Sequence, residues 1–386
     1  MQKEPKRSVL ILGAGNAQID FIKYCKEYGI ETYGCSYSDT DPGIPLFDHF
    51  EQINIVDQEG ILRYFTEEDI DQIYSVGSDI SIPTIRSTSI SCGKKTFISD
   101  KAATYCCDKS RMRHFLKDTP YALAYLMIES EEDARSEETK IFMEQMQFPL
   151  IMKPTDSQGQ RGIHKLYSVE DFYRNMEDSF HFSRKKQIIV EEYLQGKEIS
   201  VNVYMKEGEI LFFLMSDRES FSEFPGGIIK AHHLPSIYEN TPVKENVYNL
   251  VAFLVKSLEI SDGPVYFQIM IRQEKPYLIE VTPRLDGCHL WRLIEAYCGV
   301  NLLEMTMHHL LDQEQALDAC LKKKRIPHSG MTLHFICQPP GTSFSSAGQK
   351  KEEGEIYRQY YYADGQKVKA INGFMEKCGY TIFTKD

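Results

Sequence analysis

The chain opens with a short apolar strand that runs directly into a glycine turn, and this feature limits the possible folds most strongly. The run Ser8–Leu12 precedes the turn 13–16 (GAGN), and a helical pattern follows. Further strand patterns at 31–36 and 73–76 enclose a helical pattern at 58–65. Because β and α segments alternate, the sequence predicts a parallel sheet with right-handed crossovers in the N-terminal region.

The glycine turn itself allows three interpretations. A dinucleotide-binding fingerprint requires a third glycine where this chain has Gln18, so an NAD site is the weakest of them. The glycines can simply permit a tight turn between strand and helix. Alternatively, the start of the helix can face an anionic group of a substrate.

Length and composition exclude several classes of protein. At 386 residues the chain is long enough for two or three domains. A formal net charge of -12 argues against nucleic-acid binding, which needs a basic face. No segment approaches the roughly 20 apolar residues that span a bilayer, and the N-terminus lacks the pattern of a secretory signal. We therefore expect a cytoplasmic protein without a membrane partner, in which the ten scattered cysteines are reduced.

The first chemical signal is a strand that ends in a lysine and leads into a loop with two glycines. Apolar residues precede Lys153, and the loop carries Ser157, Gly159 and Gly162. Glycines let backbone N–H groups approach a polyphosphate, and the lysine adds a compact positive charge. The pattern predicts phosphate binding, although a hairpin with a solvated lysine would look the same locally.

The second signal is a strand that breaks at a short linker. An apolar run through Val190 is followed by the linker, and a second strand begins at Glu198. The free backbone of such a linker can pair with an adenine edge, while Glu191 and Glu198 can accept from its amino group and from ribose hydroxyls. A hairpin with solvated acids is the alternative.

The third signal is a hairpin, in which strand patterns at 263–271 and 277–284 are joined by residues 272–276. Side chains two apart on a strand share a face, so Glu280 and Thr282 project together, and Gln268 can face them from the partner strand. One carboxylate with neutral oxygens suits Mg²⁺ when phosphates and waters complete the octahedron. Arg284 then offers a planar fork to a phosphate.

In their order and spacing, these signals resemble the ATP-grasp superfamily, which includes biotin carboxylases, carbamoyl-phosphate synthetase large chains, D-alanine:D-alanine ligases and purine-biosynthetic ligases. The resemblance covers residues 8–310 and rests on Lys109, KPTDSQGQRG, VEEYLQGKEISV and IEVTPRLDG. It implies a ligase that phosphorylates a carboxylate with ATP and Mg²⁺, or Mn²⁺, and passes the acyl phosphate to an amine or similar nucleophile. Small-molecule carboxylates and amines are the implied partners, and a homodimer is compatible with it.

The resemblance implies a role for each matching position. The implied ATP-binding residues are Lys109, Lys153, Ser157, Gly159, Gly162, Glu191, Glu192, Tyr193, Leu194 and Glu198. The implied metal ligands are Gln268, Glu280 and Thr282. Arg284 and Lys153 are the implied catalytic residues: Arg284 matches the arginine near the transferred phosphate, and Lys153 matches the strand lysine that contacts the α-phosphate.

Five further residues are expected on the substrate side. The family's N-terminal domain places Gly15 and Asn16 at the substrate cleft. His232 and His233 belong to a segment that resembles the substrate-lining segment of the amino-acid ligase branch, but one could be a surface residue and the other packed in a sheet. Arg292 could bind a substrate carboxylate or be an ion-pair partner on the surface of its helix.

The resemblance also implies the domain organisation. We expect an α/β protein with a Rossmann-like N-terminal domain over 1–100 that binds no dinucleotide. A two-lobed ATP-grasp α+β domain follows over 101–325, with a lid lobe at about 118–188. A small β-rich C-terminal segment, an appendage over 326–386, completes the chain.

Two departures from the family pattern keep other functions open. Gln268 stands where the first metal ligand is often acidic, and Thr282 stands where asparagine is usual. A non-catalytic or regulatory ATP-binding module is therefore one alternative. A biotin-dependent carboxylase component is another, although the chain shows no recognisable bicarbonate motif.

Overall fold

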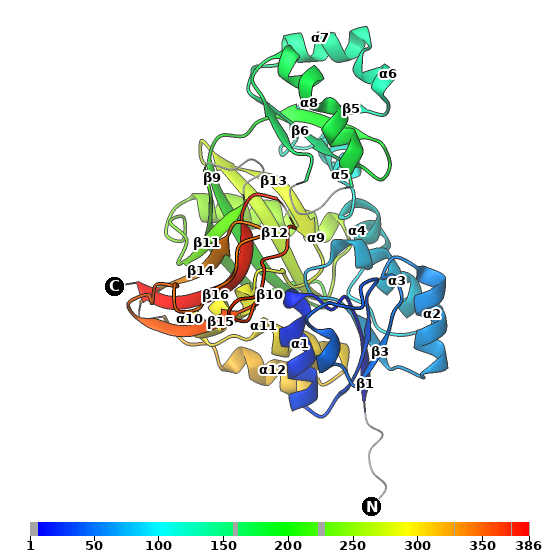
Figure 1. The fold of residues 1–386 in the computed structure, drawn as a ribbon, viewed down its shortest axis with the longest axis vertical. Coiled ribbons are helices and arrows are strands. Elements are labelled where there is room, and N and C mark those ends of the chain that lie inside the picture. The colour runs from blue at the N-terminus through cyan, green and yellow to red at the C-terminus, as the bar shows by residue number, and fades with distance from the viewer. Residues whose placement is uncertain (1–6, 157–160, 223–227, 328, 372, 386) are drawn as a thin grey trace, which may run out of the picture.

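The computed structural model describes residues 7–156, 161–222, 228–327, 329–371 and 373–385. An N-terminal unit, a small upper lobe and one large sheet with its helices make up this part of the chain (Figure 1). Among the helices described, none is long and apolar enough to cross a membrane.

The N-terminal unit is a four-stranded parallel sheet in the order β3-β2-β1-β4. Its strands are β1 (Ser8–Leu12), β2 (Glu31–Cys35), β3 (His49–Glu51) and β4 (Gln72–Tyr74). Its helices are α1 (Asn16–Glu27), α2 (Gln58–Glu67) and α3 (Ile82–Ser91), with short 3₁₀ turns η1 (Ile44–Leu46) and η2 (Asp79–Ser81). The order of these elements confirms the predicted alternation of strand and helix. All five residues of β1 are buried, as expected for a central strand of a parallel sheet.

Two short helices connect this unit to the upper lobe. They are α4 (Asp100–Tyr105) and α5 (Lys109–Leu116). Asp108 caps α5, since its carboxylate accepts from the backbone N–H groups of Ser110 and Arg111. The cap places Lys109 at the first position of the helix.

The upper lobe has its own antiparallel sheet, in the order β5-β8-β6-β7, and its own apolar core. The strands are β5 (Tyr125–Ile128), β6 (Leu150–Pro154), β7 (His164–Leu166) and β8 (Ile188–Glu192). The helices are α6 (Glu131–Ala134), α7 (Glu137–Gln145) and α8 (Val169–Phe182). Figure 1 shows this lobe standing apart from the rest, which suits a lid.

The large sheet has eight strands in the order β13-β12-β9-β10-β11-β14-β16-β15. They are β9 (Lys197–Lys206), β10 (Glu209–Ser220), β11 (Ile229–Leu234), β12 (Gly263–Arg272), β13 (Lys275–Thr282), β14 (Gly330–Gln338), β15 (Glu355–Tyr360) and β16 (Glu376–Lys385). The helices are α9 (Val243–Ser257), α10 (Leu290–Cys298), α11 (Leu302–Leu310) and α12 (Glu314–Lys322). Apolar residues of β9 pack with α9 on one face, while Tyr204 packs with α11 on the other.

The C-terminal segment is β-rich as predicted, but it is not an appendage. Its first strand, β14, pairs with β11, so Ala231 lies opposite His334, and β16 and β15 then extend the same sheet. Without β14, β11 would expose unpaired N–H and C=O groups along a sheet edge. The segment therefore completes the large sheet.

Candidate active site

A lysine, a glutamate and an arginine form a buried charged trio where the upper lobe meets the large sheet. Lys153 lies next to the last residue of β6, Glu191 lies next to the last residue of β8, and Arg113 comes from α5. The Lys153 ammonium contacts the Glu191 carboxylate, and Arg113 Nε donates to Glu191 Oε2 at 2.8 Å. These residues are only 5%, 2% and 3% exposed, respectively. One carboxylate thus faces two cations, and the trio carries a net positive charge.

Burial shifts the ionisation of the trio. It lowers the pKa of Lys153 to about 8, against the attraction of Glu191. Burial alone would raise the pKa of Glu191, but Arg113 and Lys153 together hold it at about 2. Glu191 is therefore ionised, and Lys153 is the group of the trio whose charge responds to mildly alkaline pH.

Carboxylates converge on the predicted metal face. Gln268 lies opposite Glu280 in the β12–β13 hairpin, as the sequence predicts. Asp79 of η2 approaches from the N-terminal unit: Thr282 Oγ1 donates to Asp79 Oδ1 at 2.8 Å, and the Arg284 guanidinium pairs with the same carboxylate. Burial, and then Asp79, raises the pKa of Glu280. This oxygen-rich set fits a hard divalent cation.

A close contact between Gly77 and Gly287 holds the N-terminal unit next to the β12–β13 hairpin. Gly77 has φ +70°, and a Cβ there would lie 2.7 Å from the Cα of Gly287. Gly77 N–H also donates to the Leu285 carbonyl at 3.1 Å. Only glycine fits at position 77, because a side chain there would clash with Gly287. The contact places Asp79 beside the hairpin.

Glu198 lies on the same face of the large sheet. Its carboxylate contacts both the Gln268 amide and the Arg218 guanidinium, which β10 supplies. The large sheet thus brings Glu198 next to a predicted metal ligand. Arg218 was not among the residues that the sequence singled out.

Several buried polar atoms beside Glu198 have no hydrogen-bond partner within the described part of the chain. Arg218 lies opposite His232 across β10 and β11, so their side chains share a face. Both ring nitrogens of His232 and the Nε atoms of Arg218 and Arg284 are unpartnered. Burial, followed by the charges of Arg218, Lys377 and His233, lowers the pKa of His232 and keeps it neutral. Unpartnered donors of this kind are expected where a polar ligand binds.

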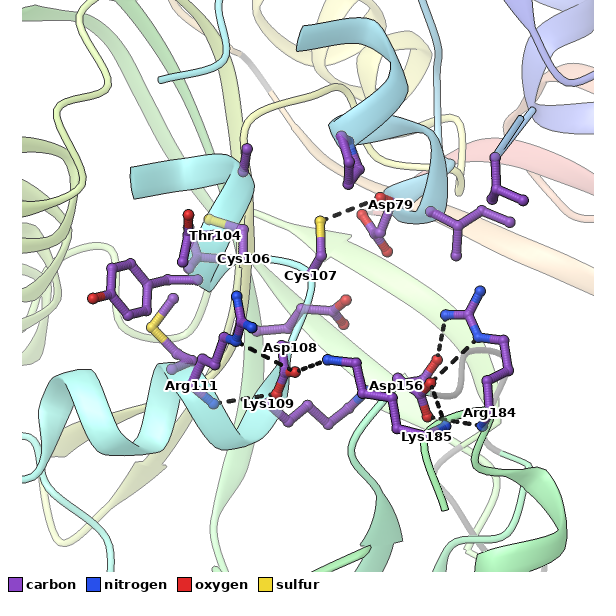
Figure 2. Close-up of a pocket in the computed structure, with 18 of the residues that line it drawn as sticks. Asp79, Thr104, Cys106, Cys107, Asp108, Lys109, Arg111, Asp156, Arg184 and Lys185 are labelled. Carbon is purple, nitrogen blue, oxygen red and sulfur yellow. Dashed lines mark hydrogen bonds and ion pairs between the residues drawn. The ribbon is translucent and has the colours of Figure 1, made fainter. Parts of the chain in front are cut away.

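A cavity of about 460 Å³ joins the three parts of the molecule (Figure 2). Asp79 lines it from the N-terminal unit, Lys109 from α5, Glu280 from β13 and Lys185 from the upper lobe. Figure 2 shows the carboxylate of Asp108 between Lys185 and the start of α5, and that of Asp156 beside Arg184. The mixed charge of the wall suits a polyphosphate accompanied by a cation.

The remaining predicted residues lie as follows. In the linker, Glu192 pairs with Arg272, Tyr193 lies under the Lys165 ammonium, and Leu194 is buried. Gly162 adopts φ +68°, while Ser157 and Gly159 lie outside the described residues.

On the substrate side, Gly15 and Asn16 stand at the start of α1. His233 bonds to Glu219 and Thr332, each at 2.9 Å. Arg292 pairs with Asp20 at 3.3 Å and stacks on Trp291 and Tyr357, which favours the ion-pair interpretation for this residue.

Sequence reasoning missed Asp79, Arg113 and Arg218. Asp79 follows β4 at the carboxyl edge of a parallel sheet, where such folds carry their sites, so its position was a usable signal. Arg113 interrupts the apolar side of α5, next to buried Met112 and one turn from buried Leu116. A charge on a buried helical face calls for a buried partner.

Comparison with known proteins agrees with this geometry. A family model described as an ATP-grasp domain matches residues 146–290. Dapdiamide A synthase of Enterobacter agglomerans is 22% identical over 250 residues, which are 62% of this chain and 58% of that protein, so the match spans little more than half of the relative.

Two solved structures share the fold over nearly the whole chain. The L-amino acid ligase from Bacillus licheniformis has a TM-score of 0.77 at 14% identity, covering 99% of this chain and 94% of that chain. Phosphoribosylglycinamide synthetase from Anaerococcus prevotii has a TM-score of 0.74 at 19% identity, with the same two coverages. The chain therefore matches the ATP-grasp domain over residues 146–290 and shares the fold of these two enzymes over nearly its whole length.

Proposed function

We propose that this protein is an ATP-dependent ligase that activates a small carboxylate as an acyl phosphate and joins it to an amine. The observation that carries the proposal is the cavity in which Lys109 and Glu280 share one wall with Asp79. Cations for a polyphosphate and carboxylates for a divalent metal meet there, beside the buried guanidinium of Arg284. Phosphoryl transfer requires such groups, because an enzyme promotes it mainly by positioning the reactants and neutralising the charge of the phosphates.

The nucleotide would lie between the upper lobe and the large sheet. Lys153 and Lys109 offer their ammonium groups to the phosphates, and the loop around Gly162 would cover them. Both oxygens of Glu191 already bind Arg113 or Lys153, so its role is to position Lys153. The backbone of 192–194 would pair with adenine, and Glu198 would accept from the ribose.

A metal ion would be held by Gln268, Glu280 and Thr282, with Asp79 close by. Carboxylate, amide and hydroxyl oxygens suit Mg²⁺ or Mn²⁺. When bound, the ion supplies charge neutralisation between the phosphates. Arg284 and Thr282 hold the Asp79 carboxylate beside these ligands.

The reacting carboxylate would lie next to Arg284 and face His232 and Arg218. One carboxylate oxygen attacks the γ-phosphorus, ADP leaves, and an acyl phosphate forms. An amine then attacks the acyl carbon and forms the C–N bond, the C–O bond to the phosphate breaks, and phosphate leaves with that electron pair while the amine loses one proton to solvent. Closure of the upper lobe would exclude water from the acyl phosphate.

The test is nucleotide binding followed by turnover. ATP with Mg²⁺ is expected to raise the melting temperature, since saturation to 100 times Kd contributes about 2.7 kcal/mol. Lys153→Ala is expected to lose this shift, and carboxylate–amine pairs are then screened for ADP release. A wild-type protein that shows no shift with ATP would overturn the proposal.

Nucleotide affinity is expected to fall as the pH rises through about 8. The pKa of Lys153 is lowered to about 8 by burial, with Glu191, Arg113 and Lys109 as the charged groups that face it. Phosphates bind the ammonium form, so above this pH each further unit weakens ATP binding by up to about tenfold. Calorimetric titration with ATP and Mg²⁺ from pH 7 to 9.5 measures the slope. Lys153→Arg stays charged and is expected to give a flat profile, whereas a flat wild-type profile contradicts this role for Lys153.

A further inference from the structure

We propose that Glu304, His308 and Cys320 form a Zn²⁺ site between α11 and α12, separate from the candidate active site. Glu304 and His308 stand four residues apart on α11, so they project from the same face. Cys320 projects from α12. One ligand atom from each residue lies within 4.8 Å of the other two, and all three residues are buried.

The histidine ring is held in the orientation that a metal ligand needs. His308 Nδ1–H donates to Gln313 Oε1 at 2.6 Å, and the ring makes a T-shaped contact with Tyr28 with centroids 5.4 Å apart. With Nδ1 protonated, the Nε2 lone pair points towards Glu304. Such a second bond from a ligating histidine is typical of protein metal sites.

The separation between His308 and Glu304 leaves room for an ion. Nε2 lies 3.8 Å from Glu304 Oε1, which is beyond hydrogen-bond range. Zn–N and Zn–O bonds of about 2.1 Å in a tetrahedron place their two ligand atoms roughly 3.4 Å apart. A shift of a few tenths of an ångström therefore brings both atoms to bonding distance.

The three donor atoms, one sulfur, one nitrogen and one oxygen, favour zinc over other divalent metals that prefer oxygen ligands. Sulfur, imidazole nitrogen and one carboxylate oxygen suit Zn²⁺, whereas Mg²⁺ and Ca²⁺ prefer oxygen alone. The thiol of Cys320, which now donates to the Ala316 carbonyl at 3.2 Å, would bind as the thiolate and release its proton to solvent. Two anionic ligands then balance the charge of the ion, and water can take the fourth position.

Glu304 has partners that any ion must share. Lys323 Nζ donates to its two oxygens at 2.9 and 2.7 Å, and the Tyr28 hydroxyl donates at 3.1 Å. A carboxylate has about four acceptor sites, and these donors use both sites of Oε1 and one of Oε2, so an ion at Oε1 must replace one of them. The Lys323 ammonium also repels a cation, and this competition gives the proposal its sharpest test.

Zinc would join distant parts of the chain. It would tie α12 to α11 and, through Tyr28 at the end of α1, to the N-terminal unit. In Figure 1, α11 and α12 lie beside α1 at the lower side of the molecule, away from the upper lobe. The inference does not depend on the proposed ligase activity.

The experiment measures Zn²⁺ binding by the reduced full-length protein after treatment with a chelator. Competition with a chromophoric chelator is expected to show one tight site per chain, and Co²⁺ is expected to give a sulfur-to-metal absorption band. Cys320→Ser and His308→Gln are expected to lose the band and to bind zinc at least about tenfold more weakly, as is Gln313→Ala through loss of orientation. Cys298→Ser, which removes a buried thiol of α10 outside the cluster, is the matched control and should keep both signals.

Lys323→Met separates a metal site from an ordinary ion-pair network. Removing the ammonium should strengthen zinc binding, because Glu304 then has one competitor fewer. Melting curves of the metal-free variants show whether each one folds. Equal zinc binding by the wild type and Cys320→Ser, or weaker binding by folded Lys323→Met, would overturn the proposal. Zinc held around Glu280, where Cys106 and Cys107 line the same cavity, would keep its absorption band in Cys320→Ser, and this result would also overturn the proposal.

Discussion

Replacing Arg284 by lysine is expected to lower the rate of ADP release by about 10²-fold, and by methionine by about 10²–10³-fold, the range found when one charge-stabilising donor is removed. Arg284 is 7% exposed, and its Nε has no partner within the described part of the chain. That donor is free to meet charge that develops on the transferred phosphate. Lysine keeps the positive charge beside Asp79, but it lacks the planar guanidinium that can donate two parallel hydrogen bonds to a phosphate. ATP binding should survive in the lysine variant, so the loss should appear in kcat.

Arg292→Lys is the matched control for this prediction. The residue lies eight positions further on, and it pairs with Asp20 and stacks on two aromatic rings. Its substitution is expected to lower the melting temperature and to leave kcat nearly unchanged. If Arg284→Lys and Arg292→Lys lost activity equally, Arg284 would not act on the reacting phosphate. Steady-state ADP release and a melting curve for each variant decide the point.

Local patterns were enough to predict the pieces of the site. The lysine at the end of β6 and the facing pair Gln268 and Glu280 depend on strand periodicity and on one tight turn. That turn, at Gln273 and Glu274, has two residues with positive φ, which explains the short connection of β12 to β13. Such features are encoded within about ten residues of sequence.

Contacts between distant segments could not be predicted in the same way. Thr282 and Asp79 are 203 positions apart, and Arg113 and Glu191 are 78 apart. No periodicity links such pairs, because they meet only once the N-terminal unit and the upper lobe pack on the large sheet. The place of β14 beside β11 has the same origin, since strand partners are chosen by free sheet edges and not by the strand's own pattern.

His232 and His233 are residues whose roles the sequence left open and the structure distinguishes. Sequence alone left substrate contact and structural packing equally open for His232 and His233. The structure separates them: His233 is bonded to Glu219, Thr332 and Lys385, while His232 is fully buried and has no partner among the described residues. An unsatisfied buried ring is costly unless a ligand satisfies it, so the substrate prediction now concerns His232.

Glu191→Gln and Lys153→Met are expected to change stability very differently, although both alter the same trio. Glutamine at 191 leaves Arg113 and Lys153 as two buried cations without a counter-charge. Breaking a buried ion pair from one side costs about 3–5 kcal/mol. The variant is expected to show a large drop in melting temperature and in the denaturant midpoint of the unfolding step that includes the upper lobe.

Methionine at 153 leaves a neutral, two-point pair between Arg113 and Glu191, because Nε and Nη2 of the arginine both reach the carboxylate. It also removes an ammonium whose charged form is disfavoured by burial. The ligand-free variant should therefore be as stable as the wild type or more stable, while ATP no longer stabilises it. Adding Lys153→Met to Glu191→Gln should recover part of the loss, since one of the two uncompensated cations is then gone. Equal destabilisation by both single variants would show that packing, and not the net positive charge of the trio, governs this junction. If the opposite effects are observed, the protein gives up stability in its ligand-free form to keep a positive charge ready for an anionic ligand.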